Sequence, residues 1–240
     1  MDGRRDQLTS RIVISKIGVT RLLVATVIVL HVLNVPALAF TYLWPPLDWT
    51  RAYIVFFSVS GEGKLPTFYS GMTLLAAAAL LGLIAAHERS RGGRFHRHWA
   101  GLGIIFVLMA LDEMFRVHEM TIRPLREIFG VTSGALSRAW VIPAMAFLAV
   151  MAVAYFRFLV ALPARSRALF VIAGAIYVGG ALGLEMVGGV YTSTYQRDLT
   201  YGVIATLEEV LEMAGMVLFL YGLMDHAEHH AAQNQIHIVA

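Results

Sequence analysis

Apolar stretches of about 20 residues recur six times along the chain, with short polar segments between them. A helix of that length crosses the hydrocarbon core of a bilayer, which is roughly 30 Å thick. The pattern therefore predicts an all-α polytopic membrane protein, a bundle of six transmembrane helices. The predicted helices cover 20–42, 66–86, 99–120, 138–161, 167–190 and 200–224, between a basic segment, 1–19, and a His-rich tail, 225–240.

The distribution of Lys and Arg predicts the direction of these helices. Twelve of them fall in the segments on one side of the predicted bundle, against six on the other, with Arg116 inside a helix. Cytoplasmic segments of membrane proteins carry the excess of Lys and Arg. We therefore expect both termini, the basic segment and the tail in the cytoplasm, with Trp and Tyr residues at the membrane interfaces.

The first apolar stretch has an alternative interpretation. Basic residues, an apolar core and the sequence VPALAF resemble a secretory signal with an Ala-x-Ala cleavage motif formed by Ala37 and Ala39. We expect this stretch to remain as a membrane helix. Cleavage would leave five helices with the same direction.

Composition supports the assignment to membrane proteins and excludes several kinds of functional site. Hydrophobic residues make up 58% of the chain and charged residues 15%, whereas soluble domains carry about 25% charged residues. The chain has no cysteine, which excludes disulfides, thiolate metal sites and a cysteine nucleophile. The net charge of +3 comes from basic residues beside the predicted helices, where they would orient the protein in the membrane. We therefore expect no nucleic-acid partner. The expected partners are the lipid bilayer and a membrane protein or a second copy of the chain.

Acidic residues gather at one predicted depth, toward the outer side of the membrane. The third predicted helix ends in LDEMFRVHEM, the fifth has one carboxylate near its outer end, and the sixth begins with TLEEVLEMAG. Only Lys and Arg were used to orient the helices, so this agreement is independent of the orientation. The acidic residues at this depth are Asp112, Glu113, Glu119, Glu185, Glu208, Glu209 and Glu212, with Glu62 in the first outer loop.

Helical periodicity predicts which of these side chains share a face. On a regular third helix, Asp112, Arg116 and Glu119 lie on one face, whereas Glu113 and His118 point elsewhere. On the sixth helix, Glu208 and Glu212 share a face. Residues 119–137 could form a short helix on the outer interface, which would be either a simple connector, as we expect, or a lid over the site. Gly179 and Gly183 predict a small-residue face for close helix packing.

Placing so many carboxylates within the membrane is energetically unfavourable. We therefore expect positive charge or bound protons to balance them. A charged residue in mid-membrane costs about 2.5–3.5 kcal/mol on insertion scales. Arg116 and Arg123 are too few to pair with all the carboxylates, so protons or a metal ion must balance the others. Carboxylates with one imidazole suit Fe, Mn, Zn or Ca. The Glu-x-x-His and His-Glu-x-x-His motifs are absent from the sequence, so no particular metal is indicated.

We therefore expect a membrane-embedded, metal-dependent enzyme that acts on a lipid-like substrate near the outer leaflet. Arg116 would pair with a carboxylate or bind an anionic head group. The alternatives are an accessory subunit of a larger complex, a proton or ion conductor, and an ion-pair network that only fixes helix packing. The expected catalytic residues are Asp112, Glu113 and Arg116, the expected ligands of the divalent metal ion are His118, Glu119, Glu185, Glu208, Glu209 and Glu212, and Glu62 is a further candidate.

Three segments resemble an uncharacterised family of bacterial multi-pass membrane proteins. They are GEGKLPTFYS before the second predicted helix, LDEMFRVHE at the end of the third and LEEVLEMAGMVLFLYGL in the sixth. The resemblance covers most of residues 55–224. It implies a bacterial inner-membrane protein and says nothing of a substrate. Its motif positions are Glu62, Asp112, Glu113, His118, Glu119, Glu208, Glu209 and Glu212.

Overall fold

A computed structural model describes residues 15–44, 47–59 and 64–235, and every regular element in these ranges is a helix. The predicted all-α fold is confirmed for this part of the chain. The elements are α1 (Lys16–Tyr42), α2 (Asp48–Phe57), α3 (Leu65–Ser90), α4 (His96–Phe115), α5 (Val117–Phe129), α6 (Val141–Ala161), α7 (Ala164–Val178), the π-helix η1 (Gly179–Leu184), α8 (Glu185–Thr194) and α9 (Leu199–Gln235).

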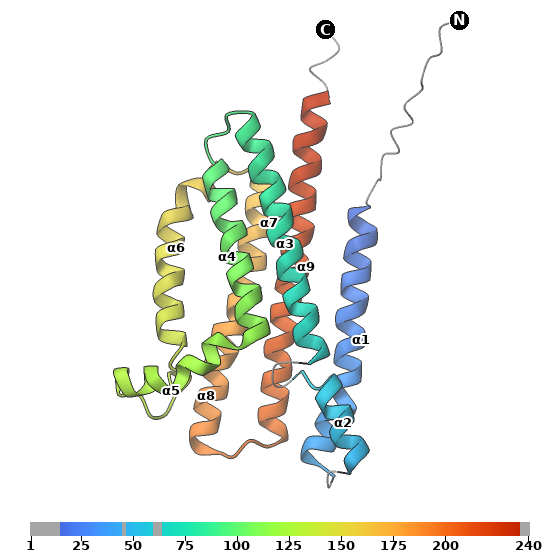
Figure 1. Cartoon of the computed structure of the whole chain (residues 1–240), viewed down its shortest axis with the longest axis vertical. Coiled ribbons are helices and arrows are strands. Elements are labelled where there is room, and N and C mark those ends of the chain that lie inside the picture. The colour runs from blue at the N-terminus through green and yellow to red at the C-terminus, as the bar shows by residue number, and fades with distance from the viewer. Residues whose placement is uncertain (1–14, 45–46, 60–63, 236–240) are drawn as a thin grey trace, which may run out of the picture.

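Five helical segments in the described ranges are long and apolar enough to cross a membrane. They are α1, α3, α4, α6 and the continuous segment Ala164–Thr194, which comprises α7, η1 and α8. The chain is therefore a multi-pass membrane protein by the length and composition of its helices. The long helix α9 packs against α1, α3, α7, η1 and α8 and so occupies the centre of the bundle (Figure 1).

The bundle has two distinct ends. The start of α1 and the end of α9 lie at one end, and the short helices α2 and α5 lie at the other, together with the turn between α8 and α9 (Figure 1). We call this second end the α5 end. The sequence pattern did not predict α2, because its ten residues are too few for a membrane-crossing helix.

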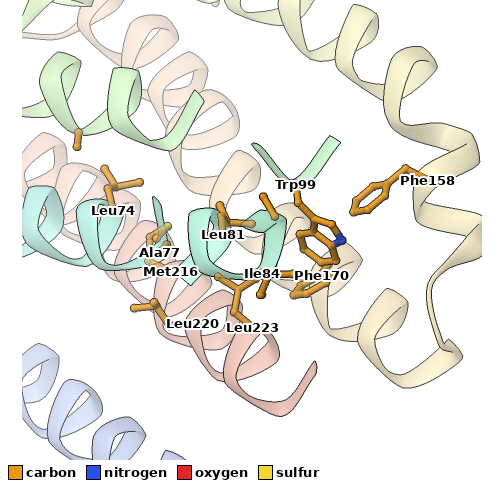
Figure 2. Close-up of a cluster of buried hydrophobic side chains, with 12 residues drawn as sticks. Leu74, Ala77, Leu81, Ile84, Trp99, Phe158, Phe170, Met216, Leu220 and Leu223 are labelled. Atoms are coloured by element: carbon orange, nitrogen blue, oxygen red, sulfur yellow. The ribbon is translucent and has the colours of Figure 1, made fainter. Parts of the chain in front are cut away.

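Most of the hydrophobic core lies in the half of the bundle away from the α5 end. Side chains of α3, α4, α7 and α9 interlock there, and Leu81 and Leu223 are fully buried (Figure 2). Trp99 of α4 contacts Phe158 of α6 edge to face, with ring centroids 4.8 Å apart. This contact holds the far end of α6, and in α6 only Val141 and Phe158 are buried.

The third predicted helix, 99–120, is present as α4, but its predicted end is wrong because regular helical winding stops at Arg116. Helix α4 ends at Phe115, and Arg116 has left-handed backbone angles of φ 58° and ψ 37°. This conformation costs a residue that has a Cβ about 1–2 kcal/mol of free energy. Helix α5 then leaves the bundle sideways (Figure 1), and none of its residues is buried. The region expected to be a connector thus begins with a helix of 13 residues.

Close packing of α9 depends on other glycines than those predicted. A Cβ added to Gly179 or Gly183 would meet nothing within 4 Å, so these residues do not form the expected packing face. A Cβ on Gly180 would lie 2.8 Å from the Glu208 carbonyl oxygen, and one on Gly215 would lie 2.8 Å from the Tyr177 backbone nitrogen. Gly180 and Gly215 are therefore the positions where η1 and α7 approach α9 most closely.

Helix α9 continues past residue 224, where the His-rich tail was expected to begin. Asp225 and His226 are both buried. The Asp225 carboxylate accepts hydrogen bonds from Lys16 Nζ at 2.7 Å and from Arg165 Nε at 2.8 Å. The Ser166 hydroxyl lies 3.0 Å from His226 Nδ1. These contacts join α1, α7 and α9 at the end of the bundle away from α5.

A buried hydrogen bond between α1 and α9 allows a direct test of this packing. The Asn34 amide is buried, donates to the Thr206 hydroxyl at 3.0 Å and accepts from the Val59 N–H at 2.9 Å. We expect Thr206→Val to cost about 1 kcal/mol of unfolding free energy, because the amide loses its acceptor. Thr26→Val is the matched control, since the Thr26 hydroxyl bonds only within its own helix. Equal unfolding midpoints in detergent for the two variants would contradict this role.

A carboxylate-lined cavity at the α5 end

One cavity of about 490 Å³ lies between α4, α6, α7 and α9, and residues of α5, η1 and α8 add to its walls. Every acidic residue predicted to lie at one depth lines it, and His118 lines it as well. We call it the carboxylate cavity. Its acidic lining residues are Asp112, Glu113, Glu119, Glu185, Glu208, Glu209 and Glu212.

The two ends of the carboxylate cavity differ in chemistry. Helix α4 runs toward the α5 end, so its lining residues change from apolar Leu102 and Phe106 to Asp112 and Glu113 along the cavity. The apolar end is continued by side chains of α6, α7 and α9. A molecule that fills the whole space must therefore be amphiphilic. The apolar lining includes Leu102, Ile105, Phe106, Met109, Phe147, Leu148, Met151, Phe170 and Phe219.

The break at Arg116 brings His118 back toward α4. Both oxygens of the Asp112 carboxylate are engaged by this residue, one by the His118 backbone N–H at 2.7 Å and one by the ring Nδ1 at 2.8 Å. A continuous helix would have separated these side chains, as we predicted from the periodicity. Instead Glu113 and His118 both line the cavity with Asp112. The His118 ring also packs against Trp140, with centroids 4.7 Å apart.

The Glu185 carboxylate is held by two side chains from the segment before α6. Arg138 Nε lies 3.7 Å from Glu185 Oε1, and Trp140 Nε1 donates a hydrogen bond to the same oxygen at 3.2 Å. Arg138 also donates to the Tyr201 hydroxyl at 2.8 Å, which ties this segment to α9. Both members of the ion pair are largely buried, with exposed side-chain fractions of 16% for Arg138 and 14% for Glu185.

The carboxylates of α9 line the same cavity as these two groups. Glu208 is within electrostatic range of Glu185, Arg138 and His118. Among the described residues, no side chain or backbone group donates a hydrogen bond to Glu208 or Glu212, and both are half-buried against the cavity. Water or a bound ligand must therefore solvate these two carboxylates.

Two of the predicted site residues lie elsewhere or outside the described chain. Arg116 is exposed, forms an ion pair with Glu119 and does not line the carboxylate cavity. Glu62 falls outside the described residues. Arg138, Trp140 and Tyr201 line the cavity and were missed as site residues. Their positions beside predicted helix ends led us to count them only as loop charge or interface aromatics.

The described side chains do not form a preorganised metal site. No three His, Asp or Glu side chains in the described ranges are grouped so that they could hold a metal ion. The reason is visible in the contacts, because His118 occupies both Asp112 oxygens, while Arg138 and Trp140 engage Glu185. The expected metal binding is therefore not supported by this arrangement of side chains.

A family comparison covers the whole site. Residues 19–227 match the family described as Domain of unknown function (DUF8692). The chain belongs to DUF8692. The predicted membership in an uncharacterised family is thus confirmed, and the DUF8692 match includes every residue that lines the carboxylate cavity. No curated protein and no solved structure is detectably similar to the chain.

Proposed function

We propose that the chain is a membrane-embedded enzyme that acts on a lipid-like substrate at the polar end of the carboxylate cavity. The observation that carries this proposal is the single cavity that joins carboxylates from four helical segments to an apolar space between membrane-crossing helices. An alkyl chain fits the apolar part. The head group would then meet Asp112, His118 and the α9 carboxylates, which are suited to general acid–base chemistry.

We include a divalent cation, Fe, Mn, Zn or Ca, as the cofactor in this proposal. The support for it is the charge balance, because Glu208 and Glu212 have no hydrogen-bond donor in the described chain and lie close to further carboxylates. Oxygen ligands with one imidazole suit these ions. The Glu113, Glu208 and Glu212 side chains already line the cavity and would have to rotate toward one another to hold the ion. When bound, it would polarise a substrate oxygen or a water.

The membrane arrangement in the proposal is that of six crossings. Helix α9 would be the sixth, both termini would be cytoplasmic, and the α5 end would face the outer leaflet of a bacterial inner membrane. The Lys and Arg distribution supports this direction. The start of α1 and the end of α9 lie at the same end of the bundle, as an even number of crossings requires (Figure 1).

The cavity distinguishes the enzyme from the alternatives. A proton or ion conductor needs polar groups that continue across the membrane. The inner part of the carboxylate cavity is lined by apolar residues such as Phe106, Met151 and Phe219. An accessory subunit needs no cavity at its carboxylates. Both alternatives therefore receive less support than an enzyme whose site opens toward one side of the membrane.

Elemental analysis and lipid mass spectrometry on the same preparations test the proposal. The protein would be purified without added metal, beside a Glu208→Gln/Glu212→Gln variant. Glu127→Gln is the matched control, because Glu127 is an exposed carboxylate at the same end of the bundle. We expect near-stoichiometric metal and an enriched lipid in the wild type and control, and loss of the metal in the double variant. Absence of both metal and enriched lipid from the wild type would overturn the proposal.

A further inference from the structure

A second cavity, of about 580 Å³, lies at the α5 end beside the carboxylate cavity. Its walls come from α1, α2, α5, the segment before α3 and the start of α9. Its charge is opposite to that of its neighbour. In the part of the chain that the structure describes, the charged residues that line it are Lys64, Arg116, Arg123, Arg138, Arg197 and one carboxylate, Glu119. We call it the basic cavity.

Most of the acids that interact with these cations lie outside the basic cavity. Glu119 pairs with Arg116 at the wall. Glu127 lies 3.5 Å from Arg123, and Glu185 lies 3.7 Å from Arg138, but neither of these carboxylates lines the basic cavity. Asp198, beside Arg197 in the chain, accepts hydrogen bonds from the Tyr191 hydroxyl. Counted over the described residues, the wall itself presents five cations and one anion, which favours a positive potential inside.

The cations are close enough to affect one another. Burial and the Arg116 guanidinium both lower the pKa of the Lys64 ammonium, against the opposing effect of Glu209. The Arg197 guanidinium stacks over the Tyr201 ring at 5.2 Å from its centroid, which directs it along the start of α9 toward the cavity. Like charges that converge on one space repel one another, and a bound anion would relieve this repulsion.

These cations also lie on the side of the membrane where they are least expected. On the proposed topology the basic cavity is on the outer side, where Lys and Arg are depleted in short loops. Four of the six Lys and Arg residues assigned to outer loops line this single cavity, namely Lys64, Arg123, Arg138 and Arg197. A specific ligand explains this concentration, whereas a requirement for orientation would act against it.

We infer that the basic cavity binds a phosphate group, carried by a lipid head group or as free phosphate. Guanidinium groups pair with phosphate oxygens through two parallel N–H···O bonds. A phosphate presents several acceptor oxygens and up to two negative charges, which matches several converging cations better than a single carboxylate does. The hydroxyl groups of Tyr42 and Tyr201 in the wall add neutral donors.

The two cavities meet at a shared wall. Glu119, Arg138 and Tyr201 line both. A phosphate in the basic cavity would therefore lie beside the polar end of the carboxylate cavity, where a lipid-bound phosphate could be reached by the α9 carboxylates. The charge of the basic cavity stands independently of the proposed function, whereas its place on the outer side and this last step rest on the proposed topology and function.

Binding measurements on the full chain test the phosphate site. The protein would be held in a phosphate-free maltoside detergent and titrated with inorganic phosphate in one arm and with phosphatidate in mixed micelles in the other. We expect Lys64→Gln and Arg197→Gln each to weaken binding about tenfold, since each removes a charged hydrogen bond. Arg51→Gln is the matched control, because Arg51 is an exposed cation near the same end that does not line the basic cavity.

The outcomes separate the two sources of phosphate and the two proposals. Binding in both arms, weakened by the two variants, supports a free-phosphate site that also accepts lipid. Binding of phosphatidate alone supports a head-group site. Absence of binding in both arms, or equal binding by all the variants, would overturn the inference. Metal content is measured in the same samples, so a failed metal site and a failed phosphate site give different results.

Discussion

Replacing Gly215 by alanine is expected to separate α7 from α9 and to lower the unfolding midpoint strongly. The added Cβ would lie 2.8 Å from the Tyr177 backbone nitrogen and 2.9 Å from the Ala173 carbonyl oxygen. These are backbone atoms of a neighbouring helix, so no side chain can rotate to make room. Overpacking of this kind costs about 1–3 kcal/mol, and the absence of a flexible neighbour places Gly215→Ala at the upper end.

Gly179→Ala is the control for this experiment. A Cβ at Gly179 meets nothing within 4 Å, and alanine is the better helix former. We expect that variant to unfold at or slightly above the wild-type midpoint. Both variants would be compared by thermal unfolding in the same detergent. A Gly215→Ala protein that unfolds with the control would mean that α7 and α9 are further apart than the structure shows.

Replacing Glu212 by glutamine is expected to stabilise the protein in the presence of a chelator, by on the order of 2 kcal/mol. Glu212 is half-buried and lies within electrostatic range of Glu209, Glu113 and Glu208. Glutamine has nearly the same shape and removes one of these like charges. A functional site commonly lowers stability in this way, because its groups are arranged for a ligand rather than for packing.

Added metal should reverse the order of the two proteins. A ligand at 100 times its dissociation constant stabilises the folded state by about 2.7 kcal/mol, and the wild type would gain this whereas Glu212→Gln would not. Glu127→Gln, at an exposed carboxylate, should follow the wild type in both conditions. A Glu212→Gln protein that is less stable than the wild type in chelator would show that this carboxylate supports the fold.

Hydrophobic patterning predicted most of the fold because membrane helices are defined by length and polarity. The first, second, fourth and fifth predicted helices lie within α1, α3, α6 and the segment Ala164–Thr194, apart from three residues before α6. The pattern could not predict the end of α4, since arginine has no preference for the left-handed conformation that Arg116 adopts. That conformation is imposed by contacts around it, such as the one between His118 and Asp112.

The depth of the acidic residues could be predicted because it depends only on their distance along each helix. The partners of those residues could not, because they come from segments without periodicity. Arg138 and Trp140 lie in the turn before α6, and their contacts with Glu185 depend on tertiary packing. The basic cavity was missed for the same reason, since its five cations come from five separate positions between residues 64 and 197.

The π-helix η1 determines how the chain before Glu185 tolerates a change in length. Its residues, Gly179–Leu184, follow the i→i+5 hydrogen-bond pattern that a single extra residue produces within an α-helix. The wider winding takes up this residue, so deleting one residue from Gly179–Leu184 would restore a regular helix and leave the residues after it at nearly the same rotation relative to α7. The Glu185 side chain would then still face Arg138. A one-residue deletion in this segment is therefore expected to preserve the ion pair, although the segment lies directly before the site.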